Sequence, residues 1–439
     1  MRGTISGMKF RQLLLPTGLG VALVLSLVLS GMMWTNPAHS NGNSGTKVTK
    51  TSDNTNNTTF QDIYLPSYII STNKTGKQQI LINSQINIVS QLRDKMSRFK
   101  STSIQSVSQG SSSKYLKQLH RKNTLLLNYE TSMTVNFFRK VFQNYLKIPN
   151  MRFNRVQILL NDPNHLYLLN DKNYRVDRVT LKGNNSNKLK KVLSDQMVRH
   201  QVDIKLLNGK PLVYYPNAVK LKTYSFQLTQ QTETYYANRI MTTNNSSSVQ
   251  VKRRKNKTEY NDRGFRQMTV DHSNDTVTFT NYNSKTGSGS FLSTMNHAYK
   301  QMVMVGIPMD SIRLFYYDSG NDTTIFRTYV GGVPVFDQSG FGAVRFTTLD
   351  QTSYRMYFSL DSLQVPIPPE RSTTTLISMK TLMADLKNAG IKQSKISDIK
   401  LGYEWSRATD IKKAVNLSPT WYVLIDHKWE PYTDAINDN

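Results

Sequence analysis

The segment AVRFTTLDQTSYRMYFSL, residues 343–360, indicates how this chain folds. Its second half, Tyr354 to Leu360, alternates apolar with polar side chains, which is the period of a strand with one buried face. Its first half, Ala343 to Leu349, is another short run with strand character. The segment therefore predicts consecutive strands of an antiparallel sheet.

The regions on both sides of this segment repeat one pattern, in which a helix is followed by strands. Phe291, Met295, Tyr299 and Met302 fall on one helix face, and Gly306 follows its predicted end. A second helix is predicted through residues 376–386, with threonines before it and Gly390 after it. The order favours an α+β fold, with helices packed on antiparallel sheets, over an alternating α/β fold.

Earlier parts of the chain carry weaker signals. We expect an extended segment at 63–66, a Ser-rich break at 101–113 and an amphipathic helix from Phe137 to Tyr145 that Pro149 ends. Short strands are predicted from Phe153 onward, with Asn208-Gly209 as a hairpin turn. A further helix is predicted over 189–198.

Residues 13–33 form a run without a charged side chain, long enough to span a bilayer as a helix. Arg2, Lys9 and Arg11 precede it, so we expect the N-terminus in the cytoplasm and the following body outside the cell. The alternative is a signal peptide cleaved near Ala38-His39-Ser40, but its apolar core would be unusually long.

The expected fold class is therefore a single N-terminal transmembrane helix followed by a multidomain extracytoplasmic α+β body at the cell membrane. The expected parts are a cytoplasmic head (1–11), a transmembrane helix (12–34), a flexible tether (35–59), an N-terminal α+β domain (60–150), a central α+β domain (151–262) and a C-terminal α+β domain (263–439). The tether is almost pure Asn, Thr, Ser, Gly and Lys, a composition that cannot bury enough apolar surface to fold.

Small residues recur every four positions along the predicted transmembrane helix, at Gly18, Ala22, Ser26 and Ser30. This spacing lays a shallow groove along one helix face, where another helix can approach closely. The alternative is that small residues are simply common in such helices. We expect this face to be a helix contact.

The chain carries a formal net charge of +27 and contains no cysteine. Outside a cell the available polyanions are anionic lipids and wall polymers, so this location argues against nucleic acid as a partner. The densest basic cluster is a candidate anionic docking patch, and the alternative is a solvated loop. It consists of Lys252, Arg253, Arg254, Lys255 and Lys257.

No catalytic, cofactor-binding or metal-binding motif stands out, so we expect a protein that is not an enzyme and uses no cofactor. No two histidines are four residues apart, and no phosphate-binding loop occurs. Fragments of a penicillin-binding-protein pattern are present, but short Ser-x-x-Lys matches arise by chance. They are Ser97 with Lys100, Ser111 with Lys114, and Lys285-Thr286-Gly287.

Several segments resemble the YycH regulatory proteins of Gram-positive bacteria. The resemblance extends over essentially the whole chain, including the basic head and the anchor, although none of these segments is a mechanistic motif. The segments are Trp34-Thr35-Asn36-Pro37, Phe358-Ser359-Leu360-Asp361-Ser362-Leu363, Val365-Pro366-Ile367-Pro368, Leu401-Gly402-Tyr403-Glu404-Trp405 and Ser418-Pro419-Thr420-Trp421-Tyr422-Val423.

The resemblance implies a three-domain extracytoplasmic body that acts with a partner of similar build, YycI. Together they would contact the sensor histidine kinase WalK (YycG), which controls cell-wall metabolism, and the anchor helix would take part in that contact. The family offers no catalytic residue to transfer, and the resemblance leaves the sign of regulation open. The alternative function is an extracytoplasmic protein that binds or processes a cell-wall polymer.

Overall fold

The structure is a computed structural model that describes residues 58–437, except 83–87, 163, 183–197, 242–248, 263, 285–288, 337–342, 368–371, 410 and 412. All described residues belong to one compact unit that begins at Asn56. Within this part of the chain, none of the helices has the length and apolar character needed to cross a bilayer. The predicted transmembrane helix, its small-residue face, Lys285 and the helix predicted over 189–198 fall on residues outside the described ones, apart from residue 198.

The first large sheet has nine strands, and each neighbouring pair in it is antiparallel. Its strands are β1 (Tyr68–Thr72), β2 (Gln78–Ile82), β3 (Lys100–Ser108), β4 (Thr124–Thr134), β5 (Arg152–Leu159), β6 (His165–Asn170), β7 (Arg175–Lys182), β8 (Val198–Leu207) and β9 (Lys210–Tyr214). They lie in the order β3-β7-β6-β5-β4-β1-β2-β8-β9, so β3 and β9 are the edge strands.

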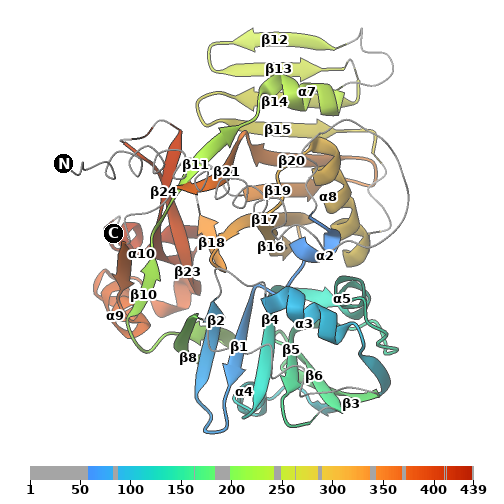
Figure 1. Ribbon diagram of the computed structural model, residues 1–439, viewed down its shortest axis with the longest axis vertical. Coiled ribbons are helices and arrows are strands. Elements are labelled where there is room, and N and C mark those ends of the chain that lie inside the picture. Colours follow the sequence, from blue (N-terminus) through green and yellow to red (C-terminus); the bar gives the residue numbers. More distant parts are fainter. Residues whose placement is uncertain are drawn as a thin grey trace, which may run out of the picture. The chain divides into compact units, whose positions relative to one another are not determined.

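The second large sheet has fourteen strands. They are β11 (Tyr224–Gln230), β12 (Gln250–Arg254), β13 (Lys257–Asn261), β14 (Arg266–Asp271), β15 (Thr276–Asn281), β16 (Ile312–Asp318), β17 (Thr323–Val330), β18 (Val333–Phe336), β19 (Ala343–Thr348), β20 (Tyr354–Ser359), β21 (Asp361–Ile367), β23 (Ile396–Arg407), β24 (Ala414–Ile425) and β25 (Lys428–Pro431). The main path is β12-β13-β14-β15-β20-β19-β17-β18-β23-β24-β11-β21, with β16 beside β17 and β25 beside β24 (Figure 1). The β18–β23 pair is parallel, and a separate pair joins β10 (Val219–Lys222) to β22 (Thr373–Leu376).

The helices pack on these sheets and connect their strands. They are α2 (Phe60–Ile63), α3 (Ile88–Met96), α4 (Ser112–Leu119), α5 (Val135–Phe142), α7 (Glu233–Met241), α8 (Phe291–Val305), α9 (Met379–Asn388), α10 (Tyr432–Asn437) and the 3₁₀ turn η2 (Gln393–Lys395). The longest of these, α8, is capped by the preceding Ser290, whose hydroxyl accepts a hydrogen bond from the Ser293 amide. It ends at Gly306, whose φ of 81° is the left-handed conformation that glycine adopts without strain.

The two large sheets share hydrophobic cores. One core cluster combines Tyr64 and Phe137 with Met295 of α8 and Phe326 of β17. The Tyr64 hydroxyl donates a hydrogen bond of 2.7 Å to the Met295 carbonyl, and its ring packs edge-on against Phe137 and Phe326. These contacts remove apolar surface of both sheets from water at one place.

The structure confirms the α+β class with antiparallel sheets, and many of the predicted elements. The two strands of the opening segment are β19 and β20, which pair with each other. The Asn208-Gly209 hairpin joins β8 to β9, with positive φ values of 48° and 82° at its two turn residues.

Three local predictions are wrong. The extended segment predicted at 63–66 is instead the last residue of α2 (Phe60–Ile63) followed by a turn, and the first strand begins at Tyr68. The Ser-rich stretch forms β3 and the start of α4. The helix through Phe137 ends at Phe142, because Gln143 adopts a φ of 51°, so Pro149 is not its stop. The division expected at 262/263 falls between β13 and β14, which pair along their length; the three-domain division stays a prediction.

Candidate functional site

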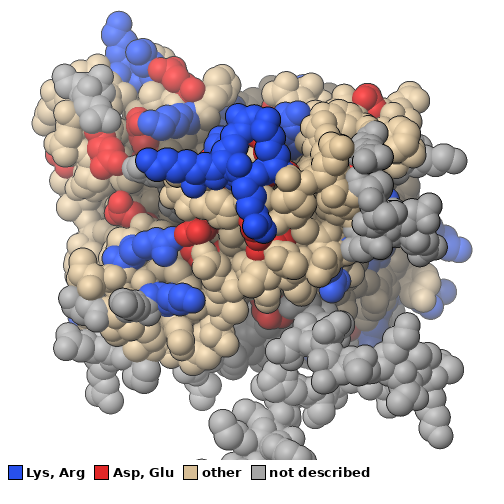
Figure 2. Space-filling view, turned by 90° about the horizontal axis from the view of Figure 1, so that it is seen from above, with Lys and Arg blue, Asp and Glu red and all other residues tan. Residues whose placement is uncertain are grey.

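The five basic residues of the predicted docking patch lie on one hairpin, β12–β13. Lys252, Arg253 and Arg254 are on β12, Lys255 is in the turn, and Lys257 begins β13. All five residues of β12 are exposed, and among the described strands β12 pairs with β13 alone, so it is the end strand of the sheet. Figure 2 looks down onto this end of the molecule, where Lys and Arg side chains gather in the centre of the face. The cluster thus lies on an ordered hairpin, and not in the solvated loop that was the alternative prediction.

Acidic side chains reduce the charge of this patch. The Arg253 guanidinium lies 3.9 Å from the Glu233 carboxylate, Arg254 lies 3.6 Å from Glu259, and Lys257 lies 3.4 Å from Asp271. Exposed pairs of this kind contribute little to stability, about 0–1 kcal/mol each. Their main effect is to lower the net positive charge of the patch, because three carboxylates lie close to its five cationic side chains.

The acidic partner Asp271 also has a local reason to stay ionised. A hydrogen bond from the Ser273 hydroxyl, together with the Ser273 amide and Lys257, lowers the pKa of Asp271. Within the described residues no ion pair involves Lys252 or Lys255. These two side chains are therefore the part of the patch with the most available positive charge.

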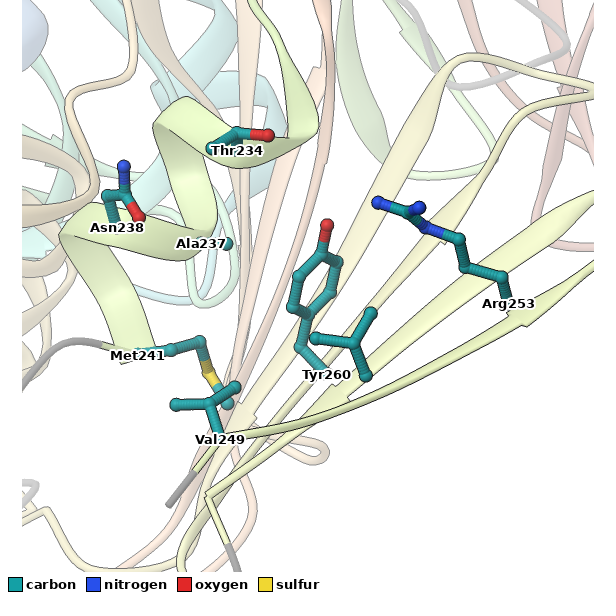
Figure 3. A pocket seen from close by; sticks show the side chains of 8 residues that line it. Thr234, Ala237, Asn238, Met241, Val249, Arg253 and Tyr260 are labelled. Atoms are coloured by element: carbon teal, nitrogen blue, oxygen red, sulfur yellow. The ribbon is translucent and has the colours of Figure 1, made fainter. Parts of the chain in front are cut away.

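The two faces of the hairpin differ in their surroundings. Helix α7 packs on β13 and β14 on one face, and an open pocket of about 650 Å³ lies between this helix and β12. Figure 3 shows helix residues on one side of the pocket and strand residues on the other. The lining residues are Thr234, Ala237, Asn238, Met241, Val249, Val251, Arg253 and Tyr260.

The lining combines an apolar floor with a few polar groups, as is usual for binding sites. Burial is the main cause that raises the pKa of Tyr260, and the nearby Glu233 adds to it. The Tyr260 hydroxyl and the Arg253 guanidinium both interact with Glu233. The Arg253 side chain keeps 75% of its surface exposed, so it is available to an anionic group in the pocket.

A second charged group lies deeper, where β4 of the first sheet meets β23 of the second. The Lys400 ammonium lies 2.7 Å from Glu130 and 2.8 Å from Asp398. Burial alone would lower the pKa of Lys400, but Asp398 and Glu130 outweigh it and raise the pKa. Burial raises the pKa of Glu130, and Lys400 opposes this effect. This group joins the two sheets.

In the part of the chain that the structure describes, the two serines of the penicillin-binding-protein pattern have local structural roles. Ser97 follows the end of α3 and donates its hydroxyl to the Asp94 carbonyl, while Lys100 begins β3. Ser111 caps α4, and its oxygen accepts a hydrogen bond from the Lys114 amide. Within the described part of the chain, no group of three or more metal-ligating side chains occurs.

The sequence predicted the basic residues of this site but not the pocket between α7 and β12, which is called the groove from here on. On the strand side its aliphatic residues are Val249 and Val251, which alternate with Gln250 and Lys252. This short alternation is a strand signal that the surrounding charges hide. The groove also needs the helix residues of α7, which sequence periodicity did not place beside it.

Family models for the YycH protein match this chain over two consecutive stretches. The N-terminal domain model matches residues 10–198, and the C-terminal domain model matches residues 211–438. None of the curated protein sequences matches.

Two solved structures are similar in fold to different degrees. The crystal structure of YycH from Bacillus subtilis has a TM-score of 0.67 at 15% identity, covering 85% of this chain and 97% of that one. An uncharacterized protein from Eubacterium rectale ATCC 33656 has a TM-score of 0.30 at 11% identity, covering 53% of this chain and 82% of that one. At these identities the first likeness shows the fold alone.

Proposed function

Because the chain belongs to the YycH protein family, we propose that it is a membrane-anchored extracytoplasmic regulator of the WalK (YycG) sensor histidine kinase. The observation that carries this proposal is the match of both family domains, which together reach from residue 10 to residue 438. The family match supports a regulator of this kinase system rather than an enzyme. Its action with YycI, and its effect on cell-wall metabolism through the kinase, are further parts of the proposal.

We infer that the membrane helix of this chain binds one state of the kinase more tightly than another. Residues 13–33 would place one helix beside the membrane helices of the kinase and of YycI. If this helix packs better against one kinase state, that state becomes more populated. The face that would make this contact carries Gly18, Ala22, Ser26 and Ser30, because small residues let two backbones approach closely.

The test is to fill this face and measure kinase association in native membranes. We expect Gly18→Leu with Ala22→Leu to weaken co-purification of the kinase and to change its signalling, because the added side chains separate the helices. Val24→Leu with Val28→Leu adds volume on the opposite face and is the matched control. Unchanged association in the first variant, with the body still folded, would contradict this assignment of the face.

The second candidate function is binding of an anionic lipid or wall polymer. The observation that favours it is the pair Lys252 and Lys255, whose ammonium groups are exposed on the hairpin. We expect Lys252→Ser with Lys255→Ser to weaken binding of the full chain, in neutral nanodiscs, to soluble teichoic acid. Binding that is unaffected by this variant and by added salt would count against the patch.

A further inference from the structure

We propose that the groove between α7 and β12, together with the open edge of β12, binds an extended segment of a partner protein whose residues alternate between apolar and acidic. This inference does not depend on the kinase proposal, because it rests on the hairpin and helix alone. The partner segment would bind by strand addition, in which a peptide joins the edge of an existing sheet.

The first support is the position of β12 in the sheet. It is the first strand in the order of the fourteen-stranded sheet, at one edge of that sheet, and lies at the top of Figure 1. In an antiparallel pair, alternate residues point their N–H and C=O groups away from the partner strand. The edge of β12 opposite β13 therefore presents backbone groups that an incoming strand can pair with.

The second support is the division of side chains between the two faces of β12. Val249, Val251 and Arg253 all line the groove. They are two residues apart, and in a strand every second side chain points to the same face. Tyr260 lies on the same face, because it stands opposite Val251 in the pairing with β13. Val251 keeps 49% of its surface exposed among the described residues, so an apolar side chain is accessible at the rim of the groove.

The helix side of the groove is regular as well. Thr234, Ala237, Asn238 and Met241 are three, four and seven residues apart, so they form one stripe along α7. Ala237 and Met241 are buried and form the apolar wall on the helix side of the groove, where Met241 lies beside Val249 (Figure 3). An added strand would place its apolar residues over this stripe and over Val251.

The opposite face of β12 selects for acidic residues. Lys252 and Arg254 project there, because they alternate with the groove residues. A strand added to this edge would place every second side chain beside them. Opposite charges facing each other across neighbouring strands contribute about 0.2–1 kcal/mol per pair.

Charged residues on edge strands commonly prevent association between sheets. Preventing association would need only the charged side chains of β12, so it does not explain why an apolar groove lies beside them. A polyanion such as a lipid surface or a wall polymer would likewise use the charges and ignore the groove. The combination of cationic face, open edge and apolar groove fits a peptide strand better than either.

The test measures binding of a labelled, end-capped peptide with alternating Val and Glu to the full chain in neutral nanodiscs. We expect this peptide to bind, and two control peptides to bind about tenfold or more weakly. One control has the same composition with all Val residues before all Glu residues. The other carries N-methyl groups on alternate amides, which removes the backbone donors that strand addition needs.

The protein variants locate the site. Val251→Glu places a charge in the groove and should weaken binding about tenfold or more. Val107→Glu is the matched control, since Val107 is 53% exposed on the edge strand β3 of the other sheet, and it should bind as the unchanged chain does. The thermal unfolding temperature of each variant verifies that it is folded.

Several outcomes overturn the proposal. Equal binding of the block peptide would show that the hairpin responds to charge alone, as a polyanion site does. Equal binding of the N-methylated peptide would exclude strand addition, and an unchanged Val251→Glu variant would exclude the groove. Loss of peptide binding in the Gly18→Leu, Ala22→Leu chain would also count against the groove, because this site is expected to be independent of the membrane contact.

Discussion

The ammonium of Lys400 lies 2.7 Å from the carboxylate of Glu130, although 270 residues separate them in the chain. Lys400 is on β23 and Glu130 is on β4, so this ion pair links the two large sheets. Each side chain keeps 15% of its surface exposed. Because the pair is largely shielded from water, its two charges depend on each other.

We expect Lys400→Met to destabilise the protein by about 3 kcal/mol, at the lower end of what removing one partner of a buried pair costs. The loss arises because Glu130 and Asp398 then remain close together without a cation. Chemical denaturation at pH 7 measures it. The double variant Lys400→Met with Glu130→Gln should recover part of the loss, and a double variant no more stable than the single one would show that the pair is not coupled.

Gly402 should not tolerate a side chain. A Cβ there would lie 2.6 Å from Cδ2 of Phe336 and 2.8 Å from Cδ2 of Tyr422, whose rings stack with centroids 4.0 Å apart. We expect Gly402→Ala to cost about 1–3 kcal/mol, measured as a shift of the urea midpoint. Gly264→Ala is the control, because no atom lies within 4 Å of its Cβ position; equal midpoints for the two variants would contradict the prediction.

His297 should make the protein less stable in mild acid. Its ring packs against Phe346 and Tyr354 at 5.5 and 5.2 Å, and burial, with a smaller contribution from Lys300, lowers the pKa of His297 below 6.5. The neutral ring is therefore favoured in the folded state. Its contribution to stability is present above pH 6.5 and is lost as the pH falls through the lower folded pKa.

A ring titration by NMR checks the direction of this pKa change. Unfolding free energies at several pH values between 7 and 5 check its consequence. His297→Phe should fall less in stability than the unchanged chain over this range. A His297 pKa at or above 6.5 would show that the ring is not shielded as described.

Ser111 should behave as a helix cap and not as a nucleophile. Its hydroxyl accepts the Lys114 amide at the start of α4, so Ser111→Ala should lower stability by about 1 kcal/mol. Ser111→Asp keeps a capping oxygen and should lose less. Covalent labelling of Ser111 by a fluorescent β-lactam would contradict this role.

The sequence predicted elements whose own residues determine them. Helix α8 is an example, because its apolar stripe and Gly306 are local features. Strand β3 is the opposite case: its Ser and Thr side chains are largely exposed at a sheet edge, and the strand forms through backbone pairing with β7. No periodic apolar pattern could reveal it.

The same distinction applies to the candidate site. The cluster from Lys252 to Lys257 was visible as a run of charge, but its acidic neighbours come from strand register. Glu259 is opposite Lys252, and Asp271 is opposite Lys257. Glu233 comes from α7, which packs over the sheet. Only the folded arrangement shows that much of the patch is neutralised and that a groove lies behind it.

The position of β11 has a consequence for the order of folding. This strand is made of residues 224–230, yet its two neighbours in the sheet are β21 and β24, which come more than 130 residues later. Pairings over such separations require closing long loops and form slowly. During synthesis β11 therefore waits without either partner until nearly the whole chain exists. A chain truncated before residue 414 would lack β24 and would leave one edge of β11 permanently unpaired. The strands near the C-terminus therefore complete the pairing of a strand from the middle of the sequence.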